Sequence, residues 1–113
     1  MRFLLTYVAK ETTPNADKSE AIRKLVEDNM KSGVLLDTGG MLPLAARVSQ
    51  AKGKFTATDG PFPETKELVV GYAIVQVRDR AEAVEQARRF MAIAGDGEGE
   101  VRQLVGPADE PHH

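Results

Sequence analysis

The sequence predicts an α+β domain in which two helices cover one face of a mainly antiparallel sheet. Segments that alternate between two faces, typical of strands, and segments with apolar residues at helical spacing follow one another as β-α-β, a hairpin, and β-α-β again. The most apolar strand has no polar face, so it belongs inside a sheet covered on both sides. The 113 residues, 42% hydrophobic and 28% charged, suit one folded domain.

The first strand is predicted at residues 2–8. Phe3, Leu5 and Tyr7 share one face of this segment, and the residues between them are partly apolar as well. We therefore expect a strand with neighbours on both sides. The polar residues 10–16 contain a proline and predict a loop.

The first helix is predicted at residues 17–32, because apolar side chains recur along this segment at helical spacing. Asp17 and Glu20 have the spacing of a capping box at its start. Gly33 follows the last apolar residue and suits the position at which a helix ends.

A short strand, a glycine turn and a hairpin are predicted next. Residues 34–36 are apolar and typical of a buried strand, and the glycines and proline of residues 37–43 (DTGGMLP) predict a break. Residues 47–50 and 54–58 then predict two strands joined at the turn sequence AKG.

A rigid connection is predicted in front of the central strand. Residues 59–63 (DGPFP) contain two prolines that fix their own φ angles and restrict the residues before them. One interpretation is a stiff corner between strands. The other is a cleft wall, with the polar residues 64–67 along its rim. Residues 68–77 follow, and their two apolar faces predict the central strand.

The second helix is predicted to start at Asp79, with Glu82 completing a capping box and Gly95 ending the helix. Residues 95–100 (GDGEGE) predict a flexible acidic turn, and residues 101–105 predict the last strand. The apolar side chains expected on the inner face of this helix are Ala83, Val84, Ala87, Phe90, Met91 and Ala94.

This order of elements is the ferredoxin-like pattern βαββαβ. Residues 1–106 are expected to form the single domain, and residues 107–113 a disordered tail. Two helices cover one face of the sheet, yet the central strand is apolar on both. Since the chain supplies no third helix, we expect a second copy of the chain to cover the other face, giving a homodimer with sheet packed on sheet.

Composition excludes several functional classes. The formal charge is −2, from 15 basic and 17 acidic residues that are scattered along the chain, so we expect neither nucleic acid nor an anionic membrane as a partner. The absence of cysteine excludes disulfides and thiolate chemistry. No apolar run is long enough for a membrane span and no signal peptide is indicated, so we expect a cytoplasmic protein.

Metal and cofactor binding are not expected. The two histidines, His112 and His113, stand at the very end and are typical of the stump of a purification tag, so we assign them no part in a site. The usual transition-metal ligand is therefore missing from the domain. The glycine-containing segments match neither a dinucleotide-binding nor a P-loop pattern, and no nucleophile elbow occurs.

The candidate catalytic residues are Asp37 and Asp59, because a buried carboxylate can act as a general base. The alternative for each is to hold a turn by accepting a hydrogen bond from a nearby backbone N–H. Arg47 is a candidate for clamping a ligand carboxylate. Its alternative role is a structural ion pair with Asp37 or Asp59.

Three further residues are candidate ligand-binding residues. Lys66 would bind an anion, and Glu64 would line the rim of the cleft. Tyr72 lies in the apolar central strand, where it serves either as a core side chain or as a hydroxyl that reaches the cleft.

Four stretches together resemble a known family. They are TDGPFPETKELVVGY at residues 58–72, KSGVLLDTGGMLP at residues 31–43, ARV at residues 46–48, and GEGEVRQL at residues 97–104. The first is similar to the signature of the DGPF branch of the YCII-related family, and the resemblance runs from Arg2 to about Val105. It implies a dimeric α+β barrel built from ferredoxin-like subunits, in agreement with the dimer expected from strand patterning.

The resemblance implies less about activity. The family is largely uncharacterised; some relatives act on small ring compounds such as chlorinated lactones, and a histidine–aspartate pair has been proposed for some. This domain has no internal histidine, so that pair cannot be carried over. Gly39 and Leu42 stand where the family often carries a glutamate and then a histidine or glutamine. DGPF genes often neighbour those of extracytoplasmic-function sigma factors, which implies a regulatory role for some members.

Two functions follow as hypotheses. The first is a homodimer with a small-molecule cleft that performs lyase- or isomerase-type acid–base chemistry on a small organic acid or lactone. The second is a non-catalytic regulatory or stress-pathway partner that acts through its dimer surface. An enzyme should show a pocket with converging polar groups and a perturbed carboxylate, and a partner protein a filled cleft and an exposed apolar patch.

Overall fold

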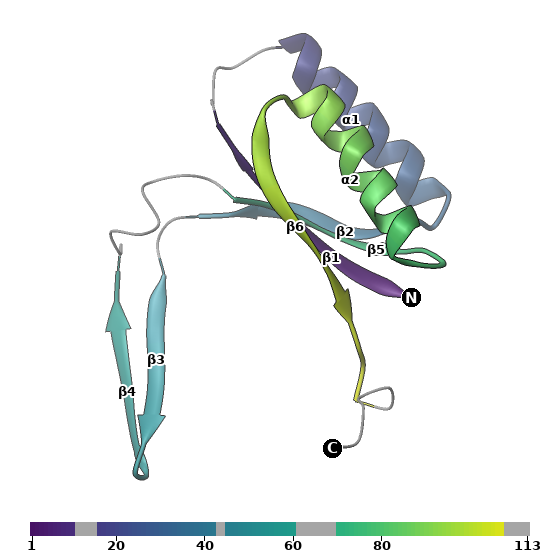
Figure 1. The fold of residues 1–113 in the computed structure, drawn as a ribbon. Coiled ribbons are helices and arrows are strands. Elements are labelled where there is room, and N and C mark those ends of the chain that lie inside the picture. The colour runs from purple at the N-terminus through teal and green to yellow at the C-terminus, as the bar shows by residue number, and fades with distance from the viewer. Residues whose placement is uncertain (11–15, 43–44, 61–69, 108–113) are drawn as a thin grey trace.

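The structure is a computed structural model that describes residues 1–10, 16–42, 45–60 and 70–107. The order of its elements confirms the predicted α+β pattern (Figure 1). In chain order they are β1 (Arg2–Ala9), α1 (Ala16–Lys31), β2 (Leu35–Met41), β3 (Ala46–Ala51), β4 (Lys54–Asp59), β5 (Val70–Gln76), α2 (Arg80–Ala94) and β6 (Gly97–Leu104).

The main sheet has four antiparallel strands in the order β2-β5-β1-β6. Both helices lie on one face of this sheet, which is the ferredoxin-like arrangement (Figure 1). Strands β1 and β5 are interior, as their two partly apolar faces predict. Neither described helix lies on the opposite face of the sheet, and we call it the open face.

The buried core lies between the helices and the sheet. Phe3 of β1 is 1% exposed and Ala83 of α2 is fully buried, and Leu35, Val75 and Val77 are the other buried apolar residues of the described ranges. Alternation along β1 and β5 places Phe3 and Val75 on the same face, directly opposite each other in the ladder. One fully packed layer therefore stabilises the described part of the chain.

The two helices end as predicted, but only one begins as predicted. Gly33 and Gly95 have φ angles of 83° and 103°, which glycine adopts without strain. Asp79 caps α2, because its carboxylate accepts a hydrogen bond of 2.9 Å from the backbone N–H of Glu82. The capping box predicted at Asp17 is wrong, since α1 begins at Ala16 and Asp17 lies within the first turn.

The glycine turn predicted after residue 36 is also wrong, because β2 runs on through Asp37 to Met41. Gly39 has a packing role in this strand. A Cβ atom there would lie 3.0 Å from the ring of Tyr72 on β5, so the missing side chain leaves room for the aromatic ring.

The flexible turn predicted at residues 95–100 is also wrong, because strand β6 already begins at Gly97. A Cβ atom on Gly97 would lie 2.5 Å from the Tyr7 ring, and one on Gly99 would overlap the carbonyl oxygen of Thr6. These glycines let β6 approach β1 closely along the ladder.

Strands β3 and β4 form the predicted hairpin as a separate two-stranded sheet. Its turn is Lys52–Gly53, with φ angles of 52° and 78°, and a type I′ turn requires positive φ at both central residues. The hairpin projects away from the main sheet (Figure 1). The predicted corner is described only as far as Gly60, whose N–H donates to the carbonyl of Ala45.

Candidate functional site

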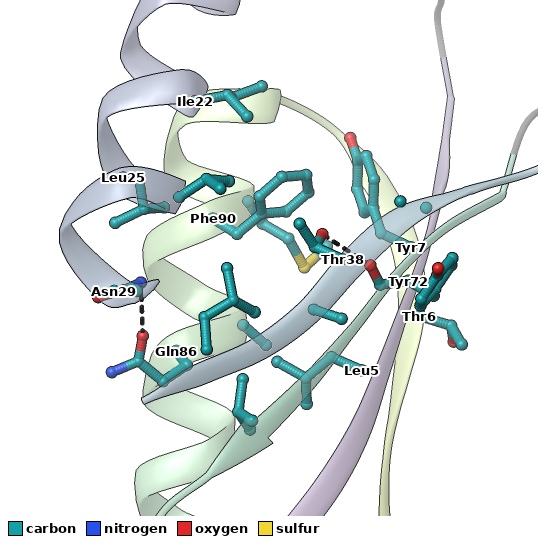
Figure 2. A pocket seen from close by; sticks show the side chains of 18 residues that line it. Leu5, Thr6, Tyr7, Ile22, Leu25, Asn29, Thr38, Tyr72, Gln86 and Phe90 are labelled. Carbon is teal, nitrogen blue, oxygen red and sulfur yellow. Dashed lines mark hydrogen bonds between the residues drawn. The ribbon is translucent and has the colours of Figure 1, made fainter. Parts of the chain in front are cut away.

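A cavity of about 280 Å³ lies between the two helices and the main sheet (Figure 2). Most of its lining is apolar and comes from both layers. The apolar lining residues are Leu5, Leu35, Ala73 and Val75 from the sheet, Ile22, Leu25 and Val26 from α1, and Ala87, Phe90 and Met91 from α2.

Polar side chains lie at several points of this lining. Asn29 of α1 donates a hydrogen bond of 3.2 Å from Nδ2 to Oε1 of Gln86 on α2, so an amide pair joins the two helices (Figure 2). Thr38 donates from Oγ1 to the backbone carbonyl of Tyr72 at 2.8 Å. Among the described residues that line the cavity, none carries a charge.

Tyr7 contributes an aromatic wall and a hydroxyl. Its ring meets Phe90 edge to face, with ring centroids 5.2 Å apart. Its hydroxyl donates to the carbonyl oxygen of Gly95 at 2.8 Å, with that of Asp96 at 3.1 Å. Burial, together with the nearby Asp96 carboxylate, raises the pKa of Tyr7 above its usual value. The phenol therefore keeps its proton at neutral pH.

Tyr72 lies on the open face. It stands opposite Thr6 and Gly39 in the ladders, and strand alternation directs all three away from the helices. The half-buried ring rests over Gly39. Both interpretations of Tyr72, as a core side chain and as a hydroxyl that reaches the cleft, stay predictions.

The other predicted site residues do not converge on the cavity. Asp37 is exposed on β2, and its carboxylate accepts a hydrogen bond of 2.9 Å from the N–H of Thr38. Arg47 and Asp59 are exposed at the base of the hairpin, where they occupy successive ladder positions and so point to opposite faces. Glu64 and Lys66 lie outside the described residues.

The structure has part of what was expected of an enzyme, a pocket with polar groups, and part of what was expected of a partner protein, exposed apolar side chains. The cavity has polar groups, as an enzyme should. However, the described carboxylate whose pKa departs from its usual value is that of Glu85, which lies on α2 outside the cavity. A hydrogen bond from Arg88 lowers the pKa of Glu85. The hairpin exposes two large apolar side chains, with Val48 at 61% and Phe55 at 62%.

Two simple structural requirements apply to the described residues, one for a metal site and one for a membrane-spanning helix. Residues 1–10, 16–42, 45–60 and 70–107 hold no group of three or more acidic or histidine side chains that could bind a metal ion. None of the helices described in these ranges has the length and apolar character needed to cross a membrane.

Sequence reasoning missed the amide pair, although the sequence contains a signal for it. Asn29 is four residues after Leu25, and Gln86 is three residues after Ala83, so both amides lie on the apolar stripes of their helices. A polar residue on such a stripe must find a partner when it is covered. Here each amide is the partner of the other.

The fold is an α+β domain that encloses a small, largely apolar cavity. Comparison with known proteins gives the family: residues 1–106 match the model of the YCII-related domain, so the chain belongs to the YCII-related family. An uncharacterized protein of Rhizobium meliloti (strain 1021) is 34% identical over 92 residues, which cover 79% of this chain and 71% of that protein.

A more distant likeness is found among solved structures. The B. subtilis GlnK–ATP complex aligns with 91% of this chain and 81% of its own, at 17% identity and a TM-score of 0.42. This likeness is too weak to carry an inference about ligands.

Proposed function

We propose that the protein binds a small, uncharged ring compound in the cavity between its helices and its sheet. The observation that carries the proposal is a cavity of about 280 Å³ with an apolar lining and one amide pair. An apolar protein cavity of roughly 150 Å³ can hold benzene, so this one has room for a ring with substituents. Burying an ionised carboxylate against an uncharged lining would be costly. A neutral lactone therefore suits the site better than an organic acid.

The proposal includes a reaction of the lyase or isomerase type, performed by acid–base chemistry. The Tyr7 phenol keeps its proton at neutral pH and donates it to the carbonyl of Gly95, so it would accept a hydrogen bond from a ligand and would not act as a base. Asp37 and Asp59 stay predictions for the base. Arg47, Glu64, Lys66 and Tyr72 stay predictions for ligand binding.

The proposal also includes a homodimer, which the open face supports. Leu4, Val70 and Ile74 lie on this face with no helix above them, and they are only half-buried in the single chain. A second copy packed there would remove this apolar surface from water. Assignment to the DGPF branch and a cytoplasmic location rest on the sequence alone.

The alternative function, a regulatory or stress-pathway partner, is favoured by the exposed apolar side chains of the hairpin. Val48 and Phe55 are more exposed than large apolar residues are in the core of a folded domain. In this case the dimer surface would carry the function, and the cavity would need no ligand.

Thermal unfolding in the presence of small compounds separates the two functions. We expect a neutral lactone or phenol near one hundred times its Kd to raise the Tm by several degrees, and the matching ring carboxylates to raise it less. Ala87→Leu should abolish the shift, because Ala87 lines the cavity. Ala81→Leu is the matched control on the exposed side of α2.

Equal shifts in both variants would show that the compounds bind elsewhere. Shifts from carboxylates alone would contradict the proposal of an uncharged ligand.

A further inference from the structure

Two hydroxyl groups in the cavity lining, those of Tyr7 and Thr38, hold their protons in bonds to the backbone. Thr38 stands opposite Ala73, which packs against the buried core, and its Oγ1 donates to the carbonyl oxygen of Tyr72 at 2.8 Å. The Tyr7 hydroxyl donates to the carbonyl oxygen of Gly95 at 2.8 Å. A hydroxyl has one proton and two lone pairs. Each oxygen can therefore still accept a hydrogen bond, but it has no second proton to donate.

The remaining polar side chains of the described lining do not change this preference. Thr6 and Tyr72 also bear hydroxyls, but strand alternation directs both side chains onto the open face. Asn29 and Gln86 are primary amides, each with an NH₂ group and a carbonyl oxygen. After their mutual hydrogen bond of 3.2 Å the pair still offers both kinds of group, so it binds a donor or an acceptor alike. Among the described lining residues, the choice between donor and acceptor therefore falls to Tyr7 and Thr38.

Thr38 is the better placed of these two acceptors. Its hydrogen bond to the Tyr72 carbonyl is partly buried, whereas the contact of the Tyr7 hydroxyl with the carbonyl of Asp96 is exposed to water. A hydrogen bond that is shielded from water contributes more than one for which water competes. Figure 2 shows Thr38 on the sheet side of the cavity and the amide pair on the helix side. A ring between them would reach both.

We propose that the cavity selects an uncharged ring that carries an N–H or O–H group, and that this group donates a hydrogen bond to Oγ1 of Thr38. The inference deepens the proposed function and rests on it, because it names the class of ring that the cavity binds. A ring with only acceptors would set its lone pairs against those of the Thr38 oxygen. Turning the Thr38 proton toward such a ring would break its bond to the carbonyl of Tyr72. A lactone therefore meets the requirement when it also carries a hydroxyl group.

Indole and benzofuran are a matched pair of ligands for the first test. The two rings have nearly the same shape, and the N–H of indole stands where benzofuran has an ether oxygen. A cavity of about 280 Å³ has room for either, since roughly 150 Å³ holds benzene. Removing an N–H from water is costly unless it finds a partner, so without an acceptor benzofuran would bind more tightly. We expect indole to bind about threefold to tenfold more tightly in isothermal titration calorimetry.

Thr38→Val tests the acceptor, because valine keeps the branched shape and lacks the hydroxyl. We expect the order of affinities to reverse in this variant, with benzofuran bound more tightly than indole. Thr38→Ser retains a hydroxyl and should keep indole ahead. Thr56→Val is the matched control, since it removes an exposed threonine hydroxyl from the hairpin, and it should leave the order unchanged. Circular dichroism establishes that each variant is folded.

Nuclear magnetic resonance locates the donor in the wild-type protein, without any substitution. With ¹⁵N-labelled indole bound, we expect a nuclear Overhauser effect between the ring N–H proton and the methyl group of Thr38. Effects from this proton to the methyl groups of other residues alone would overturn the assignment to Thr38.

The possible results distinguish the inference from the proposed function. If both rings bind and benzofuran binds at least as tightly as indole, the preference for a donor is overturned and the proposed function stands. An unchanged order in Thr38→Val would overturn the role of Thr38. If neither ring binds, the proposed function is overturned together with the inference.

Discussion

Tyr7 connects three parts of the structure through one side chain. Its ring packs against Phe90 of α2, and the missing side chain of Gly97 leaves room for it on β6. Its hydroxyl bonds the carbonyl of Gly95, where α2 ends. The residue therefore fixes the exit of α2 relative to the sheet and also forms a wall of the cavity.

We expect Tyr7→Phe to change how the stability of the protein depends on pH. Because the pKa of Tyr7 is raised in the folded state, its contribution is fully present below the unfolded pKa of about 10 and is lost as the pH rises through the folded value. Tyr7→Phe should cost about 1 kcal/mol at neutral pH from the lost hydrogen bonds. Above about pH 10 the difference between the two proteins should shrink.

Urea unfolding at neutral pH and at alkaline pH measures this difference. Lysine deprotonation affects both proteins alike, so the comparison isolates the phenol. A difference that stays constant across this range would show that burial of Tyr7 does not shift its titration.

At the scale of elements, the glycine-containing strands show which features the sequence predicts and which it does not. Each of the described helices and strands was predicted, but β2 and β6 were predicted too short, because glycine is commonest in turns. Gly39, Gly97 and Gly99 lie in strands because atoms of neighbouring strands occupy the space of their side chains. That reason concerns residues distant in the sequence, so local patterns could not reveal it.

The helix starts show the same limit. Asp79 and Asp17 are each followed three residues later by glutamate, yet only Asp79 caps a helix. Acidic residues are also favourable within a first turn, where they face the positive end of the helix dipole. The spacing therefore predicts that a helix is near, and it does not fix the first residue.

We expect Gly99→Ala to destabilise the protein far more than Gly71→Ala. A Cβ on Gly99 would overlap the Thr6 carbonyl oxygen, so β6 would have to move away from β1. On Gly71 of the interior strand β5, the nearest atom, the Tyr7 carbonyl oxygen, lies 3.8 Å away, which is an ordinary contact. The loss should exceed about 2 kcal/mol for Gly99→Ala, and urea unfolding measures both.

Comparable losses in the two glycine variants would contradict the close approach of β6 to β1. Amide hydrogen exchange adds a local measurement. In Gly99→Ala, protection should fall first along β6, which is an edge strand of the main sheet.

At the scale of the whole molecule, the described cavity and the cleft that the sequence predicts lie in different places. The sequence indicated a small-molecule cleft near Asp37, Arg47 and Asp59, whereas the described cavity lies under the helices. Its polar groups, Asn29 and Gln86, belong to helices far apart in the sequence. The spacing of residues along one helix predicts the face that a side chain occupies, and it does not predict which helix lies opposite.

At this scale we predict the mass of the protein in solution. Because the hairpin and the open face expose apolar side chains in the described part of the chain, we expect light scattering at micromolar concentration to give twice the chain mass of 12.3 kDa. A mass of one chain would contradict the homodimer. Dilution should lower the thermal stability of a dimer, because unfolding is then linked to dissociation.

The amide pair of Asn29 and Gln86 has a consequence for a ligand that changes its hydrogen-bonding character. Both side chains can turn by half a rotation, which reverses the bond between them and exchanges donor for acceptor at their outer atoms. A carbonyl can thus be held in one arrangement and the corresponding enol in the other, with no movement of either helix. The same two residues would then recognise both tautomers of a ligand.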